Sequence, residues 1–141
     1  MESLNVGGLS VLETCLYVND LDAAERFYAN VLGFKKLSTV QGRHVFFRAG
    51  EGVLLLFNPK ASLIPQDLPP HGTRGSGHCC FRIEEDNYEQ WEAHLEERGV
   101  EVVAEYSWSP GVRSLYFHDP AGNLLELAPA RIWGLGAGGS S

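Results

Sequence analysis

An internal repeat limits the folds that this chain can adopt. Residues 43–59 (RHVFFRAGEGVLLLFNP) align without a gap with residues 113–129 (RSLYFHDPAGNLLELAP). Upstream, residues 13–18 (ETCLYV) match residues 78–83 (HCCFRI), and an amphipathic stretch that ends at a glycine follows each of them. The repeat predicts two equivalent modules, so positions at which the copies differ become candidates for function. In this alignment Glu126 is opposite Leu56, and His78 is opposite Glu13.

The first copy predicts one helix and four strands. Alternating apolar residues predict a strand over 12–18, and apolar residues at helical spacing predict a helix that ends at Gly33. Asp20 or Asp22 can cap this helix, and Glu25 follows Asp22 as in a capping box. Three further strands are predicted over 35–40, 43–49 and 53–58. The order of elements is therefore β-α-β-β-β.

The second copy repeats this plan. Its predicted elements are a strand over 78–83, a helix near 87–98 and strands near 100–106, 112–118 and 123–128. We therefore expect an α+β fold in which two βαβββ modules form a curled mixed sheet around a cleft. The predicted organisation is an N-terminal extension (1–10), a first module (11–59), a proline-rich linker (60–76), a second module (77–130) and a C-terminal tail (131–141).

Composition excludes several classes of partner. The net charge of −7 and the scattered basic residues argue against nucleic acid and anionic membranes as partners. No apolar run is long enough to span a membrane, and no signal segment is recognisable at the N-terminus. Three cysteines, two of them adjacent, do not form a disulfide framework. These features predict a reduced, cytoplasmic protein.

Strand periodicity brings three polar side chains to one face. Successive side chains of a strand alternate between its two faces, so Glu13, His78 and Glu126 are expected on the face opposite the helices. Carboxylates and imidazoles on a sheet need a partner, and a divalent cation provides one. Three protein ligands would leave coordination positions open, as in catalytic sites. The alternatives are an ion pair of Glu126 with Arg82 or Arg113, and a surface salt bridge for Glu13.

Three stretches also carry a family resemblance. LETCLYVNDL (12–21), RGSGHCCFR (74–82) and YFHDPAGNLLEL (116–127) resemble, in this order, motifs of the vicinal-oxygen-chelate superfamily. This superfamily includes glyoxalase I, bleomycin-resistance proteins, fosfomycin-resistance enzymes and extradiol dioxygenases. The resemblance extends from Leu12 to Pro129, and the DPxGNxxE element is typical of the superfamily but not of one activity. It implies the glyoxalase-like fold and a homodimer.

The resemblance also implies ligands. Glu13, His78 and Glu126 fall on the family's metal-ligand positions, for a divalent ion such as Zn, Ni, Mn, Fe or Mg. Glu13 replaces the usual His or Gln, and Leu56 falls where glyoxalase I has a fourth ligand. In the dimer, Glu13 of one subunit would meet His78 and Glu126 of the other.

Roles in catalysis and substrate binding follow from the same resemblance. Glu126, or Glu13 if it is released from the metal, is implied as the general base, and Tyr116 as a hydrogen-bond donor. The repeat counterpart of Tyr116 is Phe46, which also suits plain packing. Arg74 and Tyr17 fall on positions that bind glutathione in glyoxalase I. Trp108 falls in a segment predicted to be irregular and can line a pocket or an interface.

The function predicted from these residues is a divalent-metal-dependent lyase or isomerase that acts on a small molecule with neighbouring oxygens. Two alternatives remain open from the sequence. One is an extradiol-type ring-cleaving dioxygenase, and the other is a metal-free drug-binding protein of bleomycin-resistance type.

Overall fold

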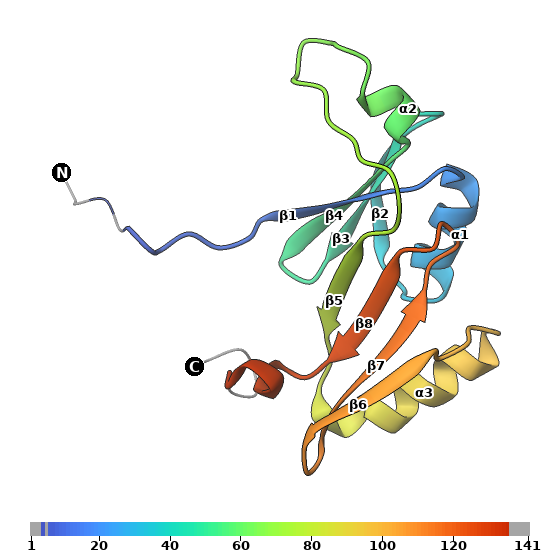
Figure 1. Ribbon diagram of the computed structural model, residues 1–141. Coiled ribbons are helices and arrows are strands. Elements are labelled where there is room, and N and C mark those ends of the chain that lie inside the picture. Colours follow the sequence, from blue (N-terminus) through green and yellow to red (C-terminus); the bar gives the residue numbers. More distant parts are fainter. Residues whose placement is uncertain (1–3, 5, 136–141) are drawn as a thin grey trace.

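The computed structural model describes residue 4 and residues 6–135 (Figure 1). Residues 1–3 and 5 of the predicted extension and residues 136–141 of the predicted tail lie outside the described part. The first half contains β1 (Glu13–Tyr17), α1 (Leu21–Asn30), β2 (Lys35–Val40), β3 (His44–Ala49), β4 (Gly52–Phe57) and a short α2 (Pro59–Ser62). The second half contains β5 (His78–Arg82), the 3-10 turn η1 (Glu85–Asn87), α3 (Tyr88–Glu97), β6 (Ala104–Ser109), β7 (Val112–His118), β8 (Leu124–Ala128) and the 3-10 turn η2 (Ala130–Trp133).

Each half forms its own four-stranded mixed sheet. The strand orders are β1-β4-β3-β2 and β5-β8-β7-β6. In both sheets the first strand pairs in parallel with the last, and the remaining pairs are antiparallel. The predicted βαβββ order and the α+β class are thus confirmed. No strand pairing joins the two sheets within the described residues. No helix in that part of the chain has the length and apolar character needed to cross a bilayer.

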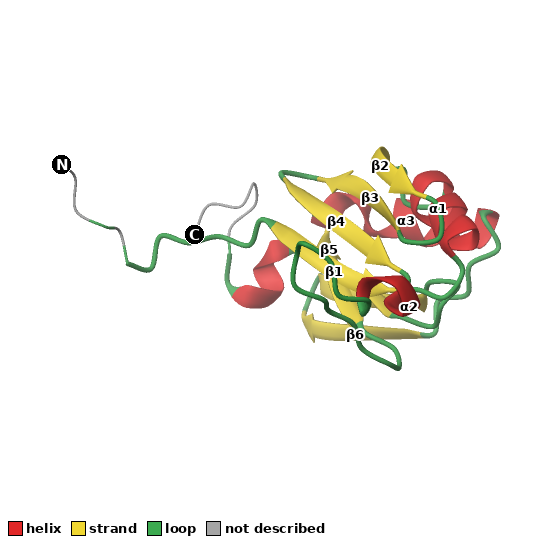
Figure 2. Cartoon of the chain, turned by 90° about the horizontal axis from the view of Figure 1, so that it is seen from above, coloured by secondary structure: helices red, strands yellow, loops and turns green. Residues whose placement is uncertain are grey.

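Both sheets share one apolar core. Leu16, Leu125 and Leu127 are buried, as the predicted strand faces require. Helix α1 contacts both sheets, because the ring of Tyr28 packs on Phe47 of β3 and that of Phe27 packs on Phe117 of β7. Helix α3 meets the end of α1, where His94 Nε2 donates a hydrogen bond to the Val31 carbonyl at 2.7 Å (Figure 2). The two modules therefore form one folding unit.

Asp20, not Asp22, caps α1. Its carboxylate accepts a hydrogen bond from the Ala23 amide at 3.0 Å, which satisfies one of the free donors of the first turn. Glu25 does not complete a capping box. It pairs instead with Lys36 of β2 at 3.1 Å and so links the helix to the strand that follows.

Two predicted boundaries differ from the structure. The strand predicted near 100–106 begins at Ala104 and extends to Ser109, because Val100 and Val102 pack on the core from an irregular segment. Trp108, predicted to be irregular, is consequently a strand residue. The proline-rich connection starts with helix α2, whose first turn is capped by Asn58 and carries Pro59, a residue suited to that position.

The structure also corrects the repeat alignment at β4 and β8. Phe46 of β3 pairs with Leu55, whereas its counterpart Tyr116 of β7 pairs with Glu126. The structural counterpart of Glu126 is therefore Leu55, and the prediction that assigned it to Leu56 was wrong. Leu56 lies in the core and is fully buried. A gapless alignment cannot detect this shift, and a shift of one residue exchanges the two faces of a strand.

The shift in register between β4 and β8 is caused by a difference in the length of the turns that precede them. The pair Ala49 and Gly52 is separated by two residues, Gly50 and Glu51. At the equivalent place the Asp119 amide donates to the Asn123 carbonyl at 3.0 Å, and three residues, 120–122, lie between them. The second turn is thus one residue longer than the first.

Two substitutions test this register. We expect Leu56→Glu to destabilise the protein by about 4 kcal/mol or to prevent folding, because it places an unpaired carboxylate in the core. Leu55→Glu should cost about 1 kcal/mol or less, because Leu55 faces the partly exposed side of the sheet. Urea denaturation followed by circular dichroism measures both. Equal destabilisation by the two substitutions would contradict the assigned register.

Candidate metal centre

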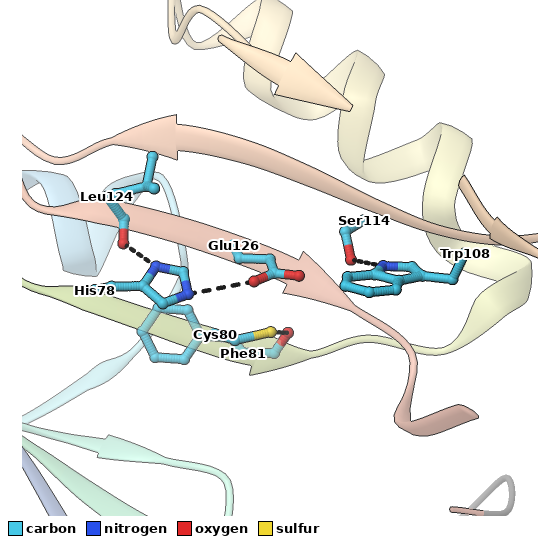
Figure 3. Close-up of polar contacts among 7 residues, drawn as sticks. All are labelled: His78, Cys80, Phe81, Trp108, Ser114, Leu124 and Glu126. Atoms are coloured by element: carbon cyan, nitrogen blue, oxygen red, sulfur yellow. Dashed lines mark hydrogen bonds and ion pairs between the residues drawn. The ribbon is translucent and has the colours of Figure 1, made fainter. Parts of the chain in front are cut away.

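His78 and Glu126 lie side by side on the face of the second sheet that is opposite the helices (Figure 3). The distance between His78 Nε2 and Glu126 Oε1 is 3.3 Å. His78 Nδ1 lies 2.8 Å from the Leu124 carbonyl oxygen. Since a carbonyl can only accept a hydrogen bond, Nδ1 carries a proton and Nε2 is directed at the carboxylate. The structure thus confirms that β5 and β8 bring these two predicted residues together.

This geometry suits a bound cation or a shared proton between the two side chains. With Nδ1 protonated, a neutral imidazole presents a lone pair at Nε2, which would face the lone pairs of Glu126 Oε1. Either a proton on Nε2 or a bound cation removes the repulsion. A histidine that donates its other ring N–H to a backbone carbonyl has the orientation usual for metal ligands.

Burial of Glu126 leads to the same conclusion. Its side chain is 8% exposed, and its Oε2 atom has no hydrogen-bond partner within the described residues. The alternative of an ion pair with Arg82 or Arg113 is not formed among the described residues, where Arg113 pairs with Glu89 and Glu126 with His78. A buried carboxylate oxygen without a partner is costly. The donor set therefore fits a divalent cation.

Tyr116 and Cys80 flank Glu126 in the same row of the sheet, because both pair with it across the strands. Burial and the negative charge of Glu126 raise the pKa of the Tyr116 hydroxyl. Burial, again together with Glu126, raises the pKa of the Cys80 thiol to about 12. Both groups therefore keep their protons at neutral pH. Tyr116 is available as a hydrogen-bond donor, and Cys80 is not a reactive thiolate.

A buried polar network holds the start of β5 and β8 in place. The Asp119 carboxylate accepts hydrogen bonds from the Tyr28 hydroxyl at 2.8 Å and from the amides of Ala121 and Asn123 at 2.9 Å. The side-chain amide of Asn123 donates to Asp119 and, at 3.1 Å, to the Tyr17 carbonyl. Tyr17 and Tyr28 belong to the first module, so the network joins the two modules. We call these five residues, Tyr17, Tyr28, Asp119, Ala121 and Asn123, the Asp119–Asn123 network.

The same network orients His78. Asn123 Oδ1 accepts a hydrogen bond from the Gly77 amide at 2.7 Å, and the Leu124 amide donates to the Gly77 carbonyl at 2.9 Å. The Leu124 carbonyl in turn accepts from His78 Nδ1. A side chain at position 77 would crowd Leu16 Cδ2 at 3.2 Å, so glycine permits the close approach. The imidazole is thus positioned by three consecutive hydrogen bonds.

The structure does not bring Glu13 to this pair. Glu13 is exposed at the start of β1, and no group of three His, Cys, Asp or Glu side chains that could hold a metal occurs among the described residues of a single chain. The predicted set of three ligands is therefore incomplete within one copy.

The two predicted substrate-binding residues lie in different surroundings. Arg74 is exposed in the connection between the modules. The Tyr17 hydroxyl lies 2.7 Å from His71 Nδ1, and the His71 ring packs edge-on against Phe57 at 4.5 Å between ring centroids. Sequence patterns do not predict the contact of His71 with Tyr17. They do not predict the roles of Asp119 and Asn123 either, although both residues belong to the DPxGNxxE element.

Comparison with known proteins agrees with this fold. The family model of the Glyoxalase/Bleomycin resistance protein/Dioxygenase superfamily matches residues 10–127. Metallothiol transferase FosB from Bacillus licheniformis is 30% identical over 134 residues, which cover 94% of this chain and 82% of that protein. Virulence protein STM3117 from Salmonella typhimurium is 30% identical over 122 residues, which cover 80% of this chain and 78% of that protein.

Among solved structures, lactoylglutathione lyase from Agrobacterium tumefaciens superposes with a TM-score of 0.86 at 37% sequence identity. The superposition covers 89% of this chain and 97% of the lyase. Family model, relatives and fold agree. The chain therefore belongs to the Glyoxalase/Bleomycin resistance protein/Dioxygenase superfamily, as the sequence resemblance predicted.

Proposed function

We propose that this protein is a divalent-metal-dependent enzyme, a lyase or isomerase, that acts on a small molecule with two neighbouring oxygen atoms. One observation carries the proposal. His78 presents Nε2 to Glu126 Oε1 at 3.3 Å while its Nδ1 is occupied by the Leu124 carbonyl, an arrangement that a cation completes. The names of two relatives, metallothiol transferase and lactoylglutathione lyase, support metal-dependent and lyase chemistry.

His78 and Glu126 would hold the ion, with Glu13 from a second copy as the third ligand. The metal, when bound, supplies Lewis-acid stabilisation of negative charge that develops on substrate oxygens. Glu126 is the general base and accepts the substrate proton at Oε2, the oxygen without a hydrogen-bond partner. Tyr116 keeps its phenolic proton, because its pKa is raised by burial and by Glu126, and donates a hydrogen bond to the substrate.

Surface features of one chain support a homodimer that completes the site. Strands β1 and β5 each pair with one neighbour only in the described structure, so both have a free edge. The segment before β1 extends away from the body of the molecule (Figure 1) and exposes Leu9, Val11 and Leu12 by 96%, 84% and 68%. Apolar side chains so exposed beside a free strand edge indicate a protein interface. Glu13 directly follows this segment.

Metal binding is the first test. Full-length protein purified without chelator should bind about one divalent ion per chain, measured by elemental analysis. His78→Ala and Glu126→Gln should each lower metal affinity at least about 100-fold, because each removes a ligand. Glu89→Gln removes an exposed carboxylate that pairs with Arg113 and is the matched control. A folded wild-type protein that binds no divalent ion would refute the proposal.

A second test separates the activities that the family offers. We expect metal-loaded protein to exchange the proton next to a carbonyl in small vicinal-oxygen substrates, which NMR in D2O detects, and Glu126→Gln to abolish the exchange. Oxygen consumption with catechols would instead identify a ring-cleaving dioxygenase. Tight binding of an aromatic cation by metal-free protein would identify a drug-binding protein.

Asn123 is not a candidate metal ligand, but the Asp119–Asn123 network predicts that its substitution weakens metal binding. Asn123→Ala removes the acceptor for the Gly77 amide and should lower metal affinity about 10-fold to 100-fold, because His78 loses its support. Calorimetric titration with Zn²⁺ measures this effect. Asn87→Ala, at a helix start where the side chain makes no capping hydrogen bond, is the control. Unchanged affinity in a folded Asn123→Ala protein would contradict the positioning role.

A further inference from the structure

Two large aromatic side chains are exposed on the sheet face that carries His78 and Glu126. Tyr106 is 55% exposed and Trp108 is 49% exposed. Their ring centroids are 4.7 Å apart, and the planes are inclined at 67°. We call these two residues the aromatic shelf. Aromatic rings of this size are usually buried, so their exposure beside a candidate metal centre indicates that a ligand binds against them.

Strand pairing places the shelf on the same face as the metal ligands. Glu126 pairs with Tyr116, and Ser114, two residues from Tyr116 on β7, pairs with Tyr106. Alternate residues of a strand share a face, so all four side chains lie on one side of the sheet. Neighbouring strands are about 4.8 Å apart, which puts β6 about 10 Å from β8. This span suits one small molecule.

A strand irregularity directs Trp108 toward the metal centre. The register between β6 and β7 shifts between Ser107 and Ser109, so Trp108 is the extra residue of a β-bulge. Its indole Nε1 donates a hydrogen bond to Ser114 Oγ at 2.9 Å, and Ser114 is fully buried. Figure 3 shows the indole extending from β6 toward Glu126. The ring is therefore held in place before any ligand binds.

The chemistry of the shelf differs from that of the metal centre. The indole N–H is already used by Ser114, so Trp108 offers its apolar ring surface. Tyr116 of β7 lies between β6 and Glu126 of β8 and provides a hydroxyl next to the carboxylate. A ligand that spans both parts needs oxygen atoms at one end and a planar apolar group at the other.

We propose that the aromatic shelf binds an aromatic ring of the substrate, whose other end carries the two neighbouring oxygens that chelate the metal. The inference rests on the proposed function and adds the substrate class to it: an aromatic hydroxy or oxo acid. Trp108 and Tyr106 determine specificity and take no part in the chemical step. Their contribution comes from burial of ring surface and from edge-to-face packing.

Two α-hydroxy acids test this assignment, because lactate and 3-phenyllactate share one chelating group and differ by a phenyl ring. Full-length protein loaded with Zn²⁺ is titrated with each acid by calorimetry. We expect 3-phenyllactate to bind about 10-fold or more tightly than lactate, given the ring area that becomes buried. Trp108→Ala should remove this preference and leave lactate affinity unchanged. Trp108→Phe, which keeps a ring, should retain part of it.

Leu37→Ala is the matched control, since Leu37 is 50% exposed on β2 of the other sheet, and it should preserve the preference. If lactate binds but the phenyl ring adds nothing, the shelf assignment is overturned and the metal enzyme stands. If zinc-loaded protein binds neither acid, the substrate class is wrong and the inference fails, whereas a wild-type protein that binds no Zn²⁺ refutes the proposed function as well. If Trp108→Ala converts a dimer into a monomer in light scattering, the shelf is a subunit interface and the assignment is overturned.

Discussion

The rest of the structure depends on the hydrogen bonds of the buried Asp119 carboxylate. Asp119 is 4% exposed, and its carboxylate accepts hydrogen bonds from Tyr28, Ala121 and Asn123. A buried carboxylate is stable only when its acceptor positions are filled, so the helix of the first module and the last turn of the second must meet at this point. The candidate metal centre depends on the same turn, because Asn123 continues the network to Gly77 and hence to His78.

Local patterns were sufficient to predict most of the fold. The alternation of side chains along each strand correctly predicts that Leu16, Leu125 and Leu127 lie in the core. It also predicts Glu126 and His78 on the opposite face, because the face of a strand residue depends only on its position relative to its neighbours. Longer-range features were not predictable. The register of β4 and β8 depends on turn length, and the end of β6 depends on a bulge. That Glu13 lies apart from His78 and Glu126 within one chain was not predictable either, because the pattern gives the face of each strand and not the placement of the two sheets.

The two sheets have the same strand arrangement but different side chains at equivalent positions. In the second sheet the row Cys80, Glu126 and Tyr116 is polar, and its counterpart in the first sheet is Cys15, Leu55 and Phe46. Beside that counterpart, His44 stacks on Phe46 with ring centroids 3.9 Å apart. The first sheet thus presents an apolar, aromatic surface where the second presents a carboxylate and a phenol.

The turn at residues 120–122 has a consequence for how such duplicated proteins can diverge. Because it is one residue longer than its counterpart, it decides which side of β8 receives the carboxylate. Point mutations in the turn change only local packing, whereas loss of a single codon there would turn Glu126 into the interior and place a leucine beside His78. Insertions and deletions in a surface turn are usually well tolerated, but here a change of one residue would move the carboxylate to the other face of the strand.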